Sequence, residues 1–516
     1  MSYNVGSLFA GVGGICLGFK RANESFKLVV ANEIDNQAII TYKTNFNHLL
    51  VEGDIEKILH PELLYQEMNF LNERYLILLN KIDNSNIEKE ENFIKSEVRK
   101  IKESYLNKYS NGEQFFLAEK TEEKFLKDNK SQAEIENLRN LVEYKIIKDF
   151  IEERNDLWIA TEEKSLNEKR KKMLEQKIDI LTAGFPCQAF SIAGQRKGFA
   201  DHRGELFYSV IEWVKLLEET GKGKPRILFL ENVKNLVSHD EGKTFEVITT
   251  EIKKLGYKIK YKVLNTFEYT DLPQNRERIF VICFLNEEDY INFGSFDDLE
   301  KIKKSKEDLI DALKHYLDYN LTKEEGEEFY YTKEKYPLYY NEKIDLDRDI
   351  NEMYEIYQLR RGMYVRKNKT GVCPTLTANM GTGGHNIPLI KVNDGVRKLT
   401  PKDCFNLQGF RIGNGYNLPK IKSSSLYKQA GNAVSVDIIE LIAKKIFKAL
   451  EKSDSKENLS NKGKNASINN KIIENNENEF YLKELEEITR NLINREFNDV
   501  EKQELKKIIF NILNIL

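Results

Sequence analysis

Cysteine is scarce in this chain: five cysteines are spread over 516 residues, and no two of them form a CxxC pair. That spacing argues against a zinc site and a disulfide framework, and it favours a reducing, cytoplasmic setting. The chain also lacks any apolar run of about eighteen residues, so we expect no membrane-spanning helix. The N-terminal residues do not show the basic-then-apolar layout of a signal peptide. The net charge of −3 gives no sign of a polyanionic partner, so a nucleic-acid-binding surface would have to be local.

Hydrophobic residues make up 40% of the chain and charged residues 32%. This composition is typical of a globular protein, and the length gives room for roughly two or three domains. The composition of the sequence and the spacing of its apolar residues change along its length, and these changes predict the domain boundaries. The expected parts are an α/β domain at 1–60 and 177–285 closed by a helix at 435–452, a helical insertion at 61–176, a mixed and then glycine-rich, basic region at 286–431, a polar linker at 453–475 and a helical tail at 476–516.

Short apolar strand patterns recur in the α/β parts and alternate with helical patterns. They stand at 177–187, 225–233 and 276–285, and each ends in polar residues. Strands that alternate with helices in this way predict a parallel, doubly wound sheet.

A glycine-rich turn follows the first predicted strand, in the segment GSLFAGVGG at 6–14. Such a turn lets the backbone approach a ligand closely, and the helix that follows favours negative groups at its N-terminus. Glu33 ends the next strand, where a carboxylate can bind a ribose diol, and Asp54 ends a third strand region. This spacing suits a dinucleotide and S-adenosylmethionine equally.

A second candidate site combines a thiol with acidic and basic side chains. Cys187 follows a strand in the loop GFPCQAFSIAG, and Glu231 ends the strand pattern at 225–233. Both therefore lie at the carboxyl edge of the expected sheet, where doubly wound folds bind their ligands. Arg276 and Arg278 stand at alternate positions of a strand start, so we expect their side chains to point the same way. The other four cysteines are expected to be buried packing residues.

The motifs of the chain, taken in order, form a recognisable set. They are FAGVGG at 9–14, the strand-end Glu33, GDI at 53–55, GFPCQAFSIAG at 184–194, ENV at 231–233, QNRER at 274–278, RKLTPKDCFNLQGF at 397–410 and GNAV at 431–434. This ordered set resembles that of the bacterial DNA (cytosine-5)-methyltransferases of restriction–modification systems. The resemblance implies a Rossmann-like S-adenosylmethionine methyltransferase domain and a smaller target-recognition domain within 286–431.

The resemblance also implies the roles of the site residues. Cys187 would attack carbon 6 of a flipped-out cytosine, Glu231 would assist at nitrogen 3, and Arg278 with Arg276 would stabilise the carbonyl oxygen. S-adenosyl-L-methionine would be the methyl donor. Its expected contacts are Phe9, Gly11, Gly13, Glu33, Ile34, Asp54, Ile55, Pro186, Leu206 and Asn432.

Two segments of the chain are expected to contact DNA. The loop at 194–207 looks like the mobile loop that closes over the flipped base, and residues 353–411 contain ten Lys/Arg against three Asp/Glu. That local excess of positive charge is the expected footprint of duplex DNA. The residues assigned to DNA are Gln188, Arg196, Arg203, Arg360, Arg361, Arg366 and Thr375. The resemblance further implies a protein that acts as a monomer on DNA, with a cognate restriction endonuclease as a separate protein.

Some features depart from the family pattern. An insertion of more than a hundred residues separates GDI from GFPC, and Arg411 follows GF where proline is common. Two other functions stay open from the sequence. One is a transfer RNA cytosine-5 methyltransferase, against which the basic segment at 353–411 argues. The other is a non-catalytic DNA-binding regulator, against which the intact Cys187 and Glu231 argue.

Overall fold

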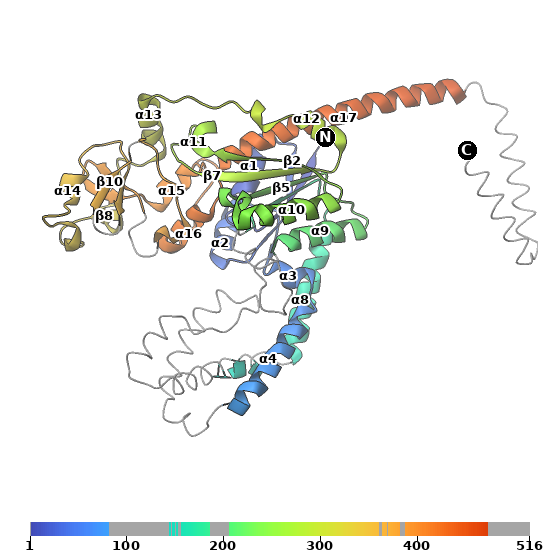
Figure 1. The fold of residues 1–516 in the computed structure, drawn as a ribbon, viewed down its shortest axis with the longest axis horizontal. Helices are drawn as coiled ribbons and strands as arrows, with labels where there is room; N and C mark the ends of the chain where they lie inside the picture. Colours follow the sequence, from blue (N-terminus) through green and yellow to red (C-terminus); the bar gives the residue numbers. More distant parts are fainter. Residues whose placement is uncertain are drawn as a thin grey trace, which may run out of the picture. The chain divides into compact units, whose positions relative to one another are not determined.

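The computed structural model describes residues 2–81, 144–185 without 146, 150 and 153–155, and 206–472 without 361–363, 369 and 382–386. The chain divides into two compact units, Met1–Leu450 and Glu451–Leu516. Among the described residues, all strands lie in the first unit, whose elements are labelled in Figure 1.

A seven-stranded sheet of order β3-β2-β1-β4-β5-β7-β6 forms the centre of the first unit. Its neighbouring strands are parallel from β3 to β5, whereas β7 is antiparallel to both β5 and β6. The strands are β1 (Tyr3–Leu8), β2 (Phe26–Glu33), β3 (Leu49–Glu52), β4 (Ile180–Ala183), β5 (Ile227–Val233), β6 (Lys258–Asn265) and β7 (Glu277–Phe284).

The doubly wound α/β fold is confirmed, but the expectation of an entirely parallel sheet is wrong for β7. Only residues 266–276 connect β6 to β7, and they hold the four-residue helix α11 (Thr266–Tyr269). A parallel return needs a crossover of roughly a dozen residues or more, so this short connection makes the two strands an antiparallel pair.

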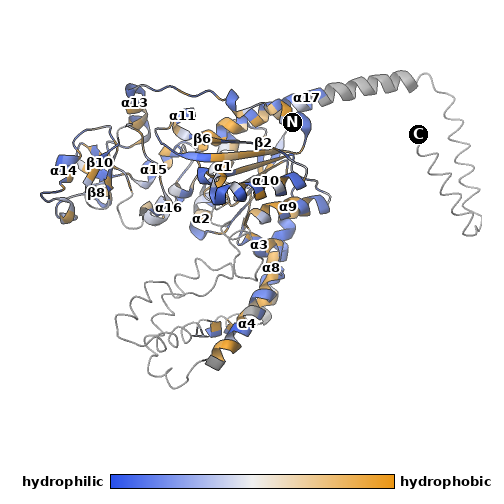
Figure 2. Cartoon of the chain, in the orientation of Figure 1, coloured by the Kyte–Doolittle hydropathy of each residue, from blue (hydrophilic) through white to orange (hydrophobic). Residues whose placement is uncertain are grey.

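Helices cover both faces of the sheet, which explains why its central strands are apolar along their whole length. β4 and β5 are buried almost throughout. One face packs against α3 (Ile55–Leu59), α9 (Leu206–Glu219) and α10 (Lys243–Lys254), and the other against α1 (Gly14–Ala22) and the first part of α17 (Val436–Ile472). Figure 2 shows hydrophobic residues in orange along strands of this sheet.

The helix α17 packs beside the first strand, although the two are far apart in the sequence. The rings of Tyr3 and Phe447 lie 6.3 Å apart, and a Cβ on Gly18 of α1 would lie 2.5 Å from the Cβ of Ile439. α17 continues to Ile472, so most of the segment predicted to be a linker (453–475) is helical.

A second, antiparallel sheet of order β10-β9-β11-β12-β8 lies within residues 286–431. Its core includes Tyr331, Tyr357 and Leu389. The strands are β8 (Tyr330–Tyr331), β9 (Tyr357–Arg360), β10 (Tyr364–Lys367), β11 (Leu389–Val392) and β12 (Gly395–Lys398). The helices of this region are α12 (Glu287–Phe293), α13 (Lys306–Tyr316), α14 (Leu346–Asp349), α15 (Pro401–Leu407) and α16 (Ser423–Asn432).

The segment predicted to be a helical insertion contains two long helices, α4 (Leu63–Lys81) and α8 (Asp156–Leu174). They touch through the hydroxyl of Tyr65, which donates to Glu163 at 2.7 Å. The tail at 476–516 lies outside the described residues.

Cys16, Cys283, Cys373 and Cys404 are buried, as the sequence predicts, and none of the four is in a disulfide. Within the described ranges, no helix is both long and apolar enough to cross a membrane. The same residues contain no group of three or more His, Cys, Asp or Glu side chains that could hold a metal ion.

Candidate active site

Glu231 and Arg278 face each other where β5 ends and β7 begins. The two strands pair antiparallel, with Val233 opposite Arg278, and Nε of Arg278 lies 3.3 Å from Oε1 of Glu231. Glu231 is 7% exposed. Burial raises the pKa of Glu231, and the opposing effects of Arg278 and Arg276 do not cancel that rise. Glu231 is therefore a carboxyl group that keeps its proton to a higher pH than a carboxyl in water.

The end of β5 is joined to the segment that leads to Cys187. The Asn232 side chain donates from Nδ2 to the carbonyl oxygen of Phe185 at 2.8 Å. A Cβ on Gly184 would lie 3.5 Å from Oε2 of Glu231, so the chain passes directly beside this carboxyl group. Asn232 belongs to the ENV motif, but the sequence alone does not indicate this contact. Pro186, Cys187, Gln188, Arg196 and Arg203 lie outside the described residues.

Arg276 has different partners from Arg278. It is 1% exposed, and its guanidinium donates from Nη1 to the carbonyl oxygen of Leu376 at 3.0 Å. Its Nη2 donates to the carbonyl oxygens of Gly431 at 3.0 Å and Ala433 at 2.5 Å. Burial, assisted by the nearby positive charge of Arg278, holds the pKa of Arg276 well below its usual range. The sequence predicts a shared role at the substrate, but this arginine joins three backbone segments.

Buried glutamines extend the same junction, and the sequence analysis missed them. Gln274 donates to the carbonyl oxygen of Leu407 at 2.8 Å, and Gln408 donates to that of Ala430 at 2.8 Å. Thr375 is held from the other side, because its hydroxyl donates to the carbonyl oxygen of Asn275 at 2.6 Å. The position of Gln274 at the start of QNRER was the available signal. The hydroxyl contact fixes the Thr375 segment beside the start of β7, and the two glutamine contacts join Gln274 to the end of α15 and α15 to α16.

The glycine-rich turn and Glu33 form the candidate cofactor site. Oε2 of Glu33 accepts from the backbone N–H of Gly11 at 2.6 Å, and Oε1 accepts from those of Ile34 at 2.9 Å and Asp35 at 2.8 Å. Burial raises the pKa of Glu33, and the three N–H groups act against that rise. Gly11 has a φ of 55°, and nothing lies within 4 Å of the place where its Cβ would be.

The other predicted cofactor residues are distributed around this turn. Ile34 is 47% exposed, so its side chain leaves an apolar surface against which a flat ring can pack. Asp54 caps α3 by accepting from the N–H of Glu56 at 3.0 Å. The side chain of Ile55 is in the core, so only its backbone is placed to meet a ligand. Asn432 is exposed at the end of α16, between Gly431 and Ala433, whose carbonyl oxygens both accept from Arg276. Phe9, Gly13 and Leu206 are also described, at the turn and at the start of α9.

A family model for C-5 cytosine-specific DNA methylase matches residues 3–72 and 147–448. These residues make up well over half of the chain and include the whole site described above. The chain belongs to this family. The match leaves out residues 73–146, which fall within the predicted insertion.

Relatives in the family agree with this assignment. Type II methyltransferase M.Bsp6I of Bacillus sp. (strain RFL6) is 45% identical over 274 residues, which cover 53% of this chain and 80% of that protein. Type II methyltransferase M.HhaI of Haemophilus parahaemolyticus is 34% identical over 284 residues, covering 53% and 76%. Among solved structures, the S. pombe Dnmt2 methyltransferase aligns over 86% of this chain and 97% of that chain, with 14% identity and a TM-score of 0.47.

The chain is thus a DNA cytosine-5 methyltransferase of the type found in restriction–modification systems, which confirms the predicted activity. Membership of this methyltransferase family implies S-adenosyl-L-methionine as the methyl donor and DNA as the substrate.

The basic side chains described within residues 353–411 include some that are paired with acidic groups and some that are not. Several cations have acidic partners: Arg397 binds Asp403 at 2.7 Å in the core, Lys367 binds Glu352 and Glu355, and Arg411 binds Asp437. Arg360 and Arg366 instead donate to the side-chain oxygen of Gln358, at 2.7 Å and 3.0 Å. Arg361 lies outside the described residues. The predicted DNA-binding role therefore fits Arg360 and Arg366 better than the paired cations.

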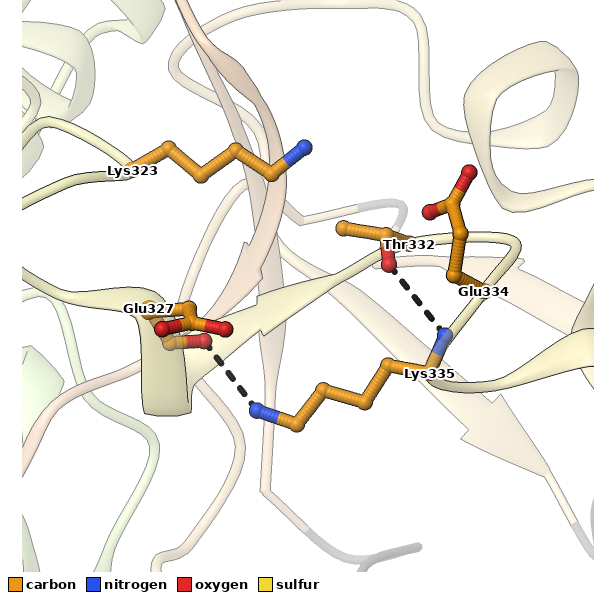
Figure 3. Close-up of a pocket in the computed structure, with 5 residues that line it drawn as sticks. All are labelled: Lys323, Glu327, Thr332, Glu334 and Lys335. Atoms are coloured by element: carbon orange, nitrogen blue, oxygen red, sulfur yellow. Dashed lines mark hydrogen bonds between the residues drawn. The ribbon is translucent and has the colours of Figure 1, made fainter.

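A cavity of about 550 Å³ lies in the region of the second sheet, and no residue of the cofactor turn is among those that line it (Figure 3). Its lining is Lys323, Glu327, Thr332, Glu334 and Lys335. Figure 3 shows Nζ of Lys335 donating to the carbonyl oxygen of Glu327. Because its lysines and glutamates offset one another in charge, we assign it no part in catalysis.

Proposed function

We propose that this methyltransferase modifies carbon 5 of a flipped-out cytosine in a short duplex DNA site through a covalent bond to Cys187. The observation that carries the proposal is the buried Glu231, which lies beside Arg278 and next to the segment that leads to Cys187. A carboxyl group with a raised pKa next to a guanidinium suits a ring that must accept a proton at one atom and develop charge at another.

The chemistry begins with a cytosine whose carbon 5 is a weak nucleophile. The thiolate of Cys187 adds to carbon 6, and the electron pair of the 5,6 double bond moves into the ring. Glu231 donates its proton to nitrogen 3, and Arg278 stabilises the charge on the carbonyl oxygen. Carbon 5, now an enamine carbon, would form the new bond to the methyl group as the bond from that methyl to the sulfonium sulfur of the donor breaks, which would leave a neutral thioether. Transfer of the carbon 5 proton to a solvent base, return of the nitrogen 3 proton to Glu231 and departure of the Cys187 thiolate restore the double bond and release a neutral product. A base stacked in the duplex cannot be reached by Cys187, so the cytosine must first be flipped out.

The turn at Gly11 and Glu33 fits the methyl donor. S-adenosyl-L-methionine supplies, when bound, a methyl group on a sulfonium centre. The open space over the Gly11 backbone would admit a ligand, the Glu33 carboxylate is held in place to accept from a ribose diol, and exposed Ile34 would pack on the adenine. Phe9, Gly13, Asp54, Ile55, Pro186, Leu206 and Asn432 would complete this site.

The second sheet and the Gln188–Arg203 segment would bind the duplex on the other side of the base. Arg360, Arg366 and Thr375 are the described members of that set. We further propose that the enzyme acts as a monomer and protects DNA from a separate endonuclease that cuts the same site.

The test is transfer of tritium-labelled methyl groups from S-adenosyl-L-methionine to duplex DNA of varied sequence. We expect incorporation with the wild type, none with Cys187→Ser, and near wild-type incorporation with Cys283→Ala, which alters a buried cysteine in β7. DNA that contains 5-fluorocytosine should form a covalent complex with the wild type and not with Cys187→Ser. Methylation of transfer RNA in preference to duplex DNA, or full activity of Cys187→Ser, would refute the proposal.

A further inference from the structure

The outer hairpin of the second sheet, formed by β9 and β10, presents two arginines on one glutamine. We propose that Arg360 and Arg366, held by Gln358, read the edges of guanines in the major groove and so set the DNA site of the enzyme. This inference rests on the proposed function, in which the substrate is duplex DNA. Arg360 and Arg366 form the arginine pair, and Gln358 is the glutamine that holds it.

The strand register places the three side chains on one face of the hairpin. β9 and β10 are antiparallel, with Gln358 directly opposite Arg366 and Arg360 opposite Tyr364. Alternate residues of a strand share a face, so Gln358 and Arg360 point the same way. Tyr357, Leu359 and Val365 lie on the opposite face and pack in the core. The face with the arginine pair is therefore the outer one, and Tyr364 on it is 54% exposed.

The contacts to Gln358 hold both guanidinium groups without neutralising them. Its Oε1 accepts from Nη2 of Arg360 and Nη2 of Arg366, and the glutamine itself is 9% exposed. Within the described part of the chain, neither arginine is ion-paired to a carboxylate, whereas Lys367 next in sequence is paired with two. A neutral amide fixes the two cations side by side and leaves their charge for a ligand.

Guanine is the base that this arrangement matches. An arginine fork donates two parallel hydrogen bonds to O6 and N7 of guanine, and the major groove is wide enough for a two-stranded ribbon. Because Oε1 of Gln358 is already engaged twice, the glutamine lacks a free oxygen with which to read adenine in the usual bidentate way. Holding both arginines in place also lowers the side-chain entropy lost on binding.

The spacing of the arginine pair suits neighbouring base pairs. Arg360 and Arg366 are diagonal neighbours across the two strands, a relationship that separates such positions by roughly 7–8 Å. Base pairs are stacked about 3.4 Å apart along the duplex. We therefore expect the two guanines within about two base steps of each other.

The experiment is methylation of a random-sequence duplex library followed by bisulfite sequencing, which reports the bases around every methylated cytosine. The wild type should show two guanine positions. Arg366→Ala should lower the preference at one of them by about 5- to 150-fold, and Arg360→Ala should do so at the other. Arg366→Lys should lose the same preference, because lysine keeps the charge and lacks the fork. Gln358→Glu should weaken both positions, since a carboxylate neutralises the pair. The matched control is Arg348→Ala, which removes an exposed arginine already paired with Asp349 in the same region.

Two results would overturn the inference. The first is a wild-type site without guanines at fixed positions near the target cytosine. The second is a uniform fall in methylation across all sequences for Arg360→Ala and Arg366→Ala. If the slope of log binding constant against log salt concentration also fell by about one in each variant, both arginines would be phosphate contacts. Absence of any methylated cytosine with the wild type would instead refute the proposed function, so the two failures are distinguishable.

Discussion

Gly431 in α16 lies directly against the backbone of Thr377. A Cβ on Gly431 would lie 2.2 Å from the carbonyl carbon of Thr377 and 2.4 Å from the backbone nitrogen of Ala378. Gly431 precedes Asn432, the proposed cofactor contact, and Thr377 follows the Thr375 segment of the proposed DNA side. The two sides of the active site therefore meet at one backbone contact, and Arg276 binds the carbonyl oxygens on both sides of it.

Gly431→Ala should destabilise the methyltransferase, because neither backbone can move aside for the methyl group without disturbing the Arg276 contacts. We expect a loss of about 1–3 kcal/mol in the free energy of unfolding, as for overpacking elsewhere. Thermal or urea unfolding measures it. Ser424→Ala, an exposed change to alanine in the same helix, is the control and should unfold like the wild type. Equal stability of the two variants would show that α16 does not approach Thr377 this closely.

Arg276→Lys and Arg278→Lys should separate positioning from catalysis. Lysine at 276 cannot reach three carbonyl oxygens with a planar fork, so Asn432 and the Thr375 segment lose their fixed positions. We expect a rise in KM for both S-adenosyl-L-methionine and DNA, together with lower stability. Arg278→Lys should keep KM and stability near the wild type and lower kcat. Steady-state kinetics with each substrate varied provide the measurement. The same pattern in both variants would contradict the division of roles.

Glu231→Gln should change the pH dependence of the rate as well as its size. The raised pKa of Glu231 means that the carboxyl keeps its proton below that pKa, and the proton is lost as the pH rises through it. Single-turnover methylation by the wild type should therefore fall on the alkaline side of that pKa. Glutamine does not titrate and cannot give up a proton, so the variant should be about 10²- to 10⁴-fold slower and lack this alkaline fall. An alkaline limb that persists in Glu231→Gln would assign it to another group.

The sequence predicted which residues belong to this site more fully than it predicted the contacts between them. The pairing of Glu231 with Arg278 did not follow from the strand pattern, because a strand end and a strand start reach the same edge of a sheet only when the two strands are antiparallel, as β5 and β7 are. The direction of β7 could not be predicted from its sequence, because central strands that are parallel and central strands that are antiparallel have similar apolar runs. The direction of β7 is decided by its short connection to β6. That connection, residues 266–276, was not part of the predicted strand patterns.

Long-range backbone contacts were beyond the sequence for a different reason. Arg276 binds carbonyl oxygens 100, 155 and 157 residues away, and a carbonyl group is present at every residue. No residue type therefore marks its partners. The role of Gln358 was hidden in a similar way. It depends on the register of β9 and β10, which a basic and glycine-rich segment does not reveal, and only that register separates Arg366 from the paired Lys367.

Glu33→Gln should weaken cofactor binding before it affects any step on DNA. Both carboxylate oxygens of Glu33 accept from backbone N–H groups, and an amide would turn one acceptor into a donor that faces an N–H of Gly11, Ile34 or Asp35. The turn that would hold S-adenosyl-L-methionine then loses a hydrogen bond and the ribose loses an acceptor. We expect the Kd measured by titration calorimetry to rise about 10- to 100-fold, consistent with the loss of one or two charge-assisted hydrogen bonds. Glu24→Gln, an exposed change just before β2, should bind the cofactor like the wild type. Unchanged affinity in Glu33→Gln would place the ribose elsewhere.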